Sequence, residues 1–159
     1  DSPTYLNMVK YMGGVGTVMS QSEVYTALQQ GVIDAGENSE RVYTDFKHYE
    51  VAPYYSYTKH IVHPDVVIAS TKFLDDMSTE DREIFDKLVL DSTNYEFDTF
   101  KESVAQAKKD AEAHGAKFVY PDVEAFREKC KPLLASIANQ SEVTKDIYNK
   151  VEALREEDK

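Results

Sequence analysis

The feature of this 159-residue sequence that most constrains its fold is the stretch from Ser78 to His114, whose apolar residues recur at helical intervals. Ser78 and Asp81 have the spacing of a capping box at its start, and Gly115 follows as a residue suited to a left-handed C-terminal cap. At about 1.5 Å per residue this helix would be on the order of 50 Å long, more than a compact domain of this size needs. We therefore expect it to reach across another part of the protein.

A second informative stretch runs from Ser20 to Asn38. Its first residue and Glu23 have capping-box spacing, and Gly31 is placed to end the helix that they begin. The β-branched pair Val32 and Ile33 predicts a short buried strand, which the chain leaves through a polar turn that ends at Asn38. Ligands of α/β proteins bind at such strand ends, so this turn is a candidate binding site.

The remaining sequence alternates short strands and helices. Helices are predicted from Pro3, with Ser2 as its N-cap, to Gly13, from Glu40 to Val51, from Pro121 to Ile137, and from Ser141 to Leu154. Strands are predicted at Thr17 to Met19, Tyr54 to Ile61, Val66 to Ile68 and Ala116 to Tyr120. Pro132 is expected to kink its helix. This alternation predicts an α/β class, as one domain or two coupled lobes.

Composition excludes several functions. The net charge of −11 argues against nucleic-acid binding, because nucleic acids require a basic surface. No apolar run is long enough to span a bilayer. Cys130 is the only cysteine, which excludes a disulfide within the chain and a thiolate metal site, and we expect it to act as a small apolar residue of its helix.

Candidate chemical sites are few. His48, His60 and His63, with Asp65, lack the spacing of metal ligands, and we expect no metal and no cofactor. A nucleophile elbow is absent. Asp34 and Glu37 lie close enough in sequence to form a general acid and base, and capping of the loop is the alternative role for them.

Five tyrosines lie between residues 43 and 57, namely Tyr43, Tyr49, Tyr54, Tyr55 and Tyr57. Pockets for sugars and acids use such flat rings with polar tips. The alternative is that they are core aromatics with hydroxyls at the surface, and we expect this for all but one or two of them.

Two motifs in this order, SEVYTALQQGVIDAGEN (Ser22 to Asn38) and HYEVAPYYSYTKHI (His48 to Ile61), precede the apolar strand and the long helix. In these features the sequence resembles the DctP-type solute-binding proteins of bacterial tripartite ATP-independent periplasmic (TRAP) transporters. The resemblance implies a type II periplasmic-binding-protein-like lobe with a short mixed sheet, flanking helices and one long lobe-spanning helix. It covers about the C-terminal half of a usual member, so residues 1–159 are expected to lack the N-terminal lobe.

The resemblance also implies a function. Family members capture a small organic acid outside the inner membrane, close two lobes around it and deliver it to the membrane subunits of a TRAP transporter. They have no catalytic activity. The expected location is periplasmic or otherwise extracytoplasmic, with a lipid anchor or secretion in a Gram-positive source.

The ligand-binding residues implied by the resemblance are Asn38, Gln21, His60 and Glu37. Asn38 matches an asparagine that hydrogen-bonds the ligand, and Gln21 stands where many members have an aromatic ring. His60 matches a histidine near the cleft, and Glu37 is expected to stabilise the loop.

The arginine that holds the ligand's carboxylate in this family would lie just before Asp1. The chain's four arginines do not match it, so the chain alone is expected to bind poorly; these are Arg41, Arg82, Arg127 and Arg155.

The polar surroundings of Gln21 and Asn38 favour a hydroxylated sugar acid such as a uronate. Two alternatives remain. One is a small acid/base enzyme that acts on a sugar acid through Asp34, Glu37 and His60. The other is a sensor or docking domain that contacts a protein partner.

Overall fold

The computed structural model describes residues 3–62 and 65–157, so the predicted cap Ser2 and the candidate ligand His63 lie outside the described residues. The chain divides into two compact units. One comprises Asp1–Gln21, Ser56–His60 and Tyr120–Lys159, and the other comprises Ser22–Tyr55 and Ile61–Val119. We call them the terminal unit and the central unit.

Three helices form the terminal unit: α1 (Pro3–Tyr11), α6 (Val123–Ala138) and α7 (Glu142–Glu157). Helix α6 packs against both α1 and α7. Local signals begin the last two helices as the sequence predicts. Asp122 caps α6 by accepting a hydrogen bond from the Glu124 amide at 3.0 Å, and Ser141 does the same for the Thr144 amide at 3.1 Å. Pro132 lies inside α6.

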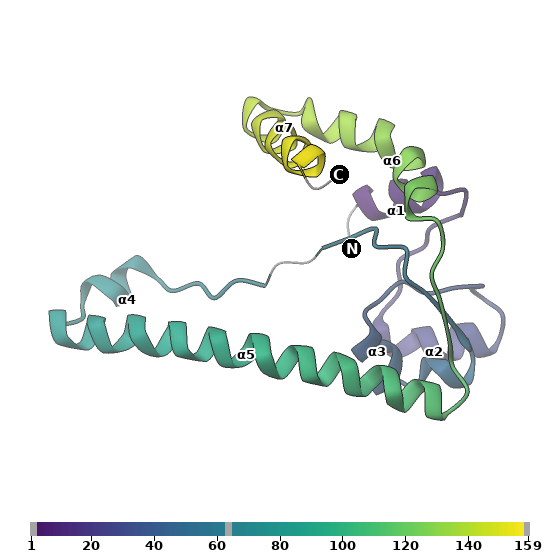
Figure 1. Cartoon of the computed structure of the whole chain (residues 1–159), viewed down its shortest axis with the longest axis horizontal. Coiled ribbons are helices and arrows are strands. Elements are labelled where there is room, and N and C mark those ends of the chain that lie inside the picture. Colours follow the sequence, from purple (N-terminus) through teal and green to yellow (C-terminus); the bar gives the residue numbers. More distant parts are fainter. Residues whose placement is uncertain (1–2, 63–64, 158–159) are drawn as a thin grey trace. The chain divides into compact units, whose positions relative to one another are not determined.

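The central unit carries most of the other elements (Figure 1). They are α2 (Gln21–Gln29), α3 (Glu40–Asp45), the 3-10 helix η1 (His48–Glu50), β1 (Tyr54–Ser56), α4 (Thr71–Asp75), α5 (Thr79–Ala113) and β2 (Lys117–Val119), with Gln21 and Ser56 at the unit's borders. Strands β1 and β2 pair in a two-stranded sheet. The sequence did not predict α4.

Helix α5 confirms the long helix, with 35 residues. Ser78 Oγ accepts from the Asp81 amide at 3.1 Å and donates to the Asp81 carboxylate at 2.7 Å, so the predicted capping interaction forms. At the other end, Gly115 has a φ of +92°, a backbone conformation that residues with a Cβ rarely adopt. The Ala116 amide then donates back to the Ala111 carbonyl at 3.0 Å, which closes the helix.

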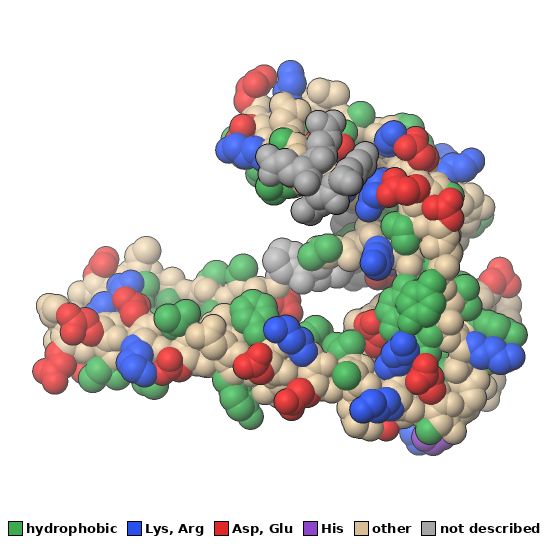
Figure 2. All heavy atoms as spheres, viewed as in Figure 1, with side chains coloured by type: hydrophobic (Ala, Val, Ile, Leu, Met, Phe, Trp, Pro, Cys, Tyr) green, Lys and Arg blue, Asp and Glu red, His purple; other side chains and the backbone are tan. Residues whose placement is uncertain are grey.

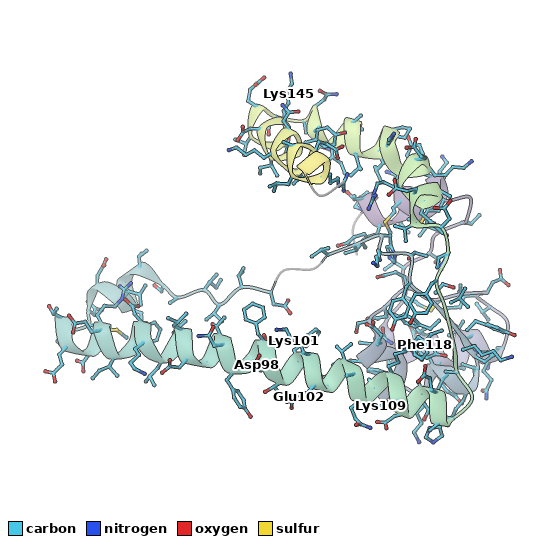
Figure 3. The ribbon with its side chains drawn as sticks, in the orientation of Figure 1. Asp98, Lys101, Glu102, Lys109, Phe118 and Lys145 are labelled. Atoms are coloured by element: carbon cyan, nitrogen blue, oxygen red, sulfur yellow. The ribbon has the colours of Figure 1, made fainter. Side chains whose placement is uncertain are left out.

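A small aromatic core lies where α3 and η1 meet the C-terminal half of α5. Tyr43, Tyr49, Ala111 and Ala116 are buried there, with Tyr55 and Phe118 packed against them. Figure 3 shows Phe118 among the side chains gathered beside this part of α5. The alanines of α5 leave room for the rings, and Thr44 Oγ1 donates to the Ala107 carbonyl at 3.1 Å. This core fixes the segment that precedes β1.

The predicted strand at Val32 and Ile33 is wrong, because the chain at this point completes the end of α2. The Gly31 amide donates to the Leu28 carbonyl and the Val32 amide donates to the Ala27 carbonyl, at 3.2 and 2.9 Å, with a Gly31 φ of +69°. This is the Schellman arrangement, and it uses amides that a strand would need for a ladder. Val32 is therefore 68% exposed rather than buried.

Two other predicted strands are also wrong. Residues 17–19 and 66–68 have no strand structure, and Val66, Val67 and Ile68 are 77–87% exposed. A strand requires a hydrogen-bonded neighbour, and within residues 3–62 and 65–157 only β1 and β2 pair. The predicted helix from Glu40 to Val51 is divided into α3 and η1, because Lys47 adopts a left-handed conformation with a φ of +54°.

Candidate functional site

The polar turn that ends at Asn38 is held between α2 and α3. A Cβ on Gly36 would lie 3.4 Å from Val24 Cγ1, so the turn passes directly over α2. Asn38 stands immediately before Ser39, the N-cap of α3, whose Oγ accepts from the Val42 amide at 3.4 Å. The Ser39 amide donates to Asn38 Oδ1 at 2.9 Å. The start of α3 therefore orients both the backbone and the side chain of Asn38.

Tyr55 connects this turn to the aromatic core. Its hydroxyl donates to the backbone carbonyl of Asn38 at 2.9 Å. Its ring lies 5.1 Å from the Tyr43 ring and 5.5 Å from the Phe118 ring, measured between centroids. Burial is the main cause that raises the pKa of Tyr55, and the negative charges of Glu40 and Glu37 raise it further. The hydroxyl therefore remains protonated and able to donate at neutral pH.

A second contact secures α2 against η1, since the Tyr25 hydroxyl donates to Glu50 Oε2 at 2.7 Å. The hydrogen bond to Glu50 is the largest cause that raises the pKa of Tyr25. The Tyr25 bond holds α2 to η1, and the Tyr55 bond holds Asn38 to β1. Asn38 therefore lies on a turn whose two flanks are both anchored.

His60 belongs to a short turn of the terminal unit. Thr58 Oγ1 and His60 Nδ1 share a hydrogen bond, and Lys59 between them has a φ of +49°. In the same turn Tyr57 stacks on Tyr120, with ring centroids 5.0 Å apart and planes inclined by 15°. His60 is half-buried. The hydrogen bond with the Thr58 hydroxyl orients the His60 ring.

The predicted site residues fall in both units. Glu37 and Asn38 are exposed neighbours in the central unit, whereas Gln21, the first residue of α2, and His60 belong to the terminal unit. That Gln21 and Asn38 bind the same ligand therefore stays a prediction. The acid/base alternative has the same division, with Asp34 and Glu37 in one unit and His60 in the other.

The tyrosine-rich segment contributes one contact that sequence reasoning did not assign. Tyr43 and Tyr49 are buried in the core, as expected for most of the five tyrosines, and Tyr54 is 62% exposed. Tyr55, in contrast, has a hydrogen bond to Asn38. The density of tyrosines after Asn38 was the signal, but it did not distinguish Tyr55 from its neighbours.

Other chemical sites receive little support. Within the described residues, no three His, Cys, Asp or Glu side chains are grouped to hold a metal ion. Cys130 is half-buried on α6, and burial raises the pKa of its thiol.

A groove of about 240 Å³ between α6 and α7 has a mainly apolar lining that includes Leu134, Ile147 and Val151. None of the helices formed by residues 3–62 and 65–157 is long and apolar enough to cross a bilayer.

Comparison with known proteins gives consistent matches. Residues 1–141 match the family model described as bacterial extracellular solute-binding protein, family 7 (DctP). The sialic acid-binding periplasmic protein SiaP of Vibrio cholerae is 34% identical over 149 residues, which are 94% of this chain and 46% of that protein.

Two solved TRAP periplasmic solute-binding proteins are also similar. The protein from Anaerococcus prevotii, with bound α/β-D-glucuronate, is 36% identical with a TM-score of 0.86, over 99% of this chain and 51% of that one. The protein from Sulfitobacter sp. NAS-14.1, with bound β-D-galacturonate, is 30% identical with a TM-score of 0.83, over 94% and 50%. The chain thus spans about half the length of these proteins. Its fold is the α/β, type II periplasmic-binding-protein-like fold that the sequence predicted.

Proposed function

The chain belongs to the bacterial extracellular solute-binding proteins of family 7, and from this premise we propose that it forms the C-terminal lobe of a two-lobe protein that captures a small organic acid. The protein delivers this acid to the membrane subunits of a TRAP transporter, and it acts in the periplasm or elsewhere outside the cytoplasm. The observation that carries the proposal is the match of 99% of the chain, at a TM-score of 0.86, to a TRAP solute-binding protein with bound glucuronate. The protein binds its ligand without transforming it.

The ligand class that we propose is a sugar acid, with uronates as the first candidates. Several similar solved proteins contain D-glucuronate or D-galacturonate. A relative in Vibrio cholerae is named for binding sialic acid, which is also a carboxylated sugar. Such ligands combine one negative charge with several hydroxyls, so amide and imidazole groups suit them as partners.

The residues proposed to contact the ligand are Asn38, Gln21 and His60, with Glu37 supporting the turn. An amide in a closed cleft both donates and accepts hydrogen bonds, which suits the hydroxyl and carboxyl groups of a sugar acid. Because the chain has a net charge of −11, a positive group beside the carboxylate would offset the repulsion of an anionic ligand. We expect that group to be an arginine on a strand before Asp1.

The proposal is tested by measuring ligand binding to the protein encoded by the complete reading frame that contains this sequence. D-Glucuronate and D-galacturonate should raise its melting temperature in a concentration-dependent way, because a ligand that binds only the folded protein stabilises it. D-Glucose and D-galactose, which lack the carboxylate, are the matched ligands and should have little effect. Chromatography of the incubated acids should recover them unchanged.

Variants then locate the site. Asn38→Ala should reduce the stabilisation by uronate, while Asn149→Ala, an exposed asparagine of α7, should not. Indifference of the melting temperature to every sugar acid and dicarboxylate would contradict the proposal and favour a docking domain. Turnover of an acid that Glu37→Ala abolishes while binding survives would favour the enzyme.

A further inference from the structure

We propose that Tyr55 is a positioning residue of the binding site, whose hydroxyl holds the backbone carbonyl of Asn38 and thereby sets the direction of the Asn38 amide. The inference rests on the proposed function, in which Asn38 contacts the ligand. The contact that carries it is the 2.9 Å hydrogen bond from the Tyr55 hydroxyl to the Asn38 carbonyl, between residues 17 positions apart.

Tyr55 is suited to this role because its own position is fixed. Its backbone lies in β1, which pairs with β2, and its ring packs against Tyr43 and Phe118. The hydroxyl of Tyr55 is therefore a fixed donor at the edge of a packed core.

Asn38 needs such a support because its own surroundings are open. Residues 34–39 of the turn are all exposed, and α3, which the turn precedes, has only six residues. The bond from the Ser39 amide to Asn38 Oδ1 orients the side chain relative to α3, and the Tyr55 bond orients the backbone relative to the sheet. Together they restrict the amide before a ligand arrives, which lowers the entropy lost on binding.

Burial raises the pKa of Tyr55 and so keeps its hydroxyl protonated, and nearby negative charges act in the same direction. Glu37 and Glu40 both act electrostatically on Tyr55, and their carboxylates oppose its ionisation. A phenolate would repel the Asn38 carbonyl instead of donating to it. Tyr55 is consequently a donor over the whole range in which an extracytoplasmic protein works.

A double-mutant cycle with the complete protein tests the inference. Titration calorimetry with D-glucuronate would compare the wild type, Tyr55→Phe, Asn38→Ala and the double variant. Tyr55→Phe keeps the ring and removes only the hydroxyl, so we expect affinity to fall about five- to tenfold, the range for one lost hydrogen bond. In the Asn38→Ala background the same change should alter affinity less than about twofold, because no amide remains to be positioned.

Tyr43→Phe is the matched control, since it keeps the ring that packs on Tyr55 and removes only the hydrogen bond from the Tyr43 hydroxyl to the Ala52 carbonyl, 2.8 Å long, which does not involve Asn38. It should lower the melting temperature at least as much as Tyr55→Phe while leaving affinity within about twofold of the wild type. An equal loss of affinity from Tyr55→Phe with and without the Asn38 side chain would overturn the inference, because a general structural effect acts in both backgrounds. So would an unchanged affinity in Tyr55→Phe.

A ligand-free measurement separates this inference from the proposed function. In the chain itself, Tyr55→Phe should shift the NMR signal of the Asn38 side-chain amide and accelerate hydrogen exchange at the Ser39 amide, and Tyr43→Phe should do neither. If no sugar acid binds the wild type, the proposed function fails. The NMR result then still decides whether Tyr55 positions Asn38, and unchanged spectra would refute it.

Discussion

The two halves of α5 have similar apolar content but different surroundings. In the C-terminal half Ala107 and Ala111 are buried against α3 and the aromatic core. The N-terminal half exposes its large apolar side chains among charged ones, along the helix seen in Figure 2. These are Ile84, Leu88, Leu90 and Tyr95, between 53% and 74% exposed.

The difference teaches that the number of apolar residues does not determine burial. Small alanines are covered because α3 supplies rings of matching shape, whereas the contact described for the aromatics of the N-terminal half is the Phe73 and Phe85 pair, 5.8 Å apart. Both halves remain helical, because capping and helical spacing act locally. Packing against α3 stabilises the C-terminal half, and local ion pairs such as Arg82 with Asp86 contribute to the N-terminal half.

The largest expected effect comes from removing a ring from the packed half. Tyr43→Ala should reduce the free energy of unfolding by about 3–5 kcal/mol, as for large aromatic truncations in cores, because Tyr43 contacts Tyr49, Tyr55 and Phe118. Tyr95→Ala in the exposed half should change it by no more than about 0.5 kcal/mol. Urea denaturation of the chain measures both, and equal losses would remove the distinction between the halves.

Adding volume should distinguish the buried side of the C-terminal half from its exposed side, by a smaller amount. Ala111 is fully buried, so Ala111→Leu would force the rings apart and cost about 1–3 kcal/mol. Ala105→Leu, at an exposed position of the same helix, should cost less than about 0.5 kcal/mol. If urea denaturation finds Ala111→Leu neutral, the core around α5 is looser than its burial indicates.

The cap of α5 tests the half that depends on local interactions. Ser78→Ala removes the acceptor of the Asp81 amide and should cost about 1 kcal/mol of helix stability. Ser70→Ala is the control, because Ser70 stands at the N-cap of α4 without a side-chain cap bond. Hydrogen exchange in the first turn of α5 should accelerate for Ser78→Ala alone, and unchanged exchange would show that contacts elsewhere hold this end.

The smallest expected effect is on the pH dependence of stability, through the buried His48. His48 is 6% exposed, and burial lowers its pKa. The unfolded chain therefore binds a proton at higher pH than the folded protein, and His48 reduces stability as the pH falls below about 6.5. His48→Gln should weaken this loss in denaturation series between neutral and mildly acidic pH. The exposed His114 gives the control His114→Gln, and an identical slope in both variants would exclude the effect.

Much of the helical structure could be predicted because its signals are local. Ser78 with Gly115, Asp122 and Ser141 each mark a helix boundary through bonds to residues a few positions away. Strands were predicted less well, since a run of β-branched residues occurs both in sheets and in loops, and the sequence alone does not distinguish the two. Val32 joins the end of α2 through the Ala27 carbonyl, and Val66 to Ile68 have no strand structure and are exposed.

For the candidate site, the sequence by itself determined that a polar turn ending at Asn38 follows a capped helix and precedes a tyrosine-rich segment. Only the tertiary structure decided that Tyr43 and Tyr49 enter the core while the Tyr55 hydroxyl reaches the Asn38 carbonyl. The physical reason is distance along the chain. Caps and turns depend on neighbouring residues, but a bond across 17 positions depends on how β1, β2 and the end of α5 pack together.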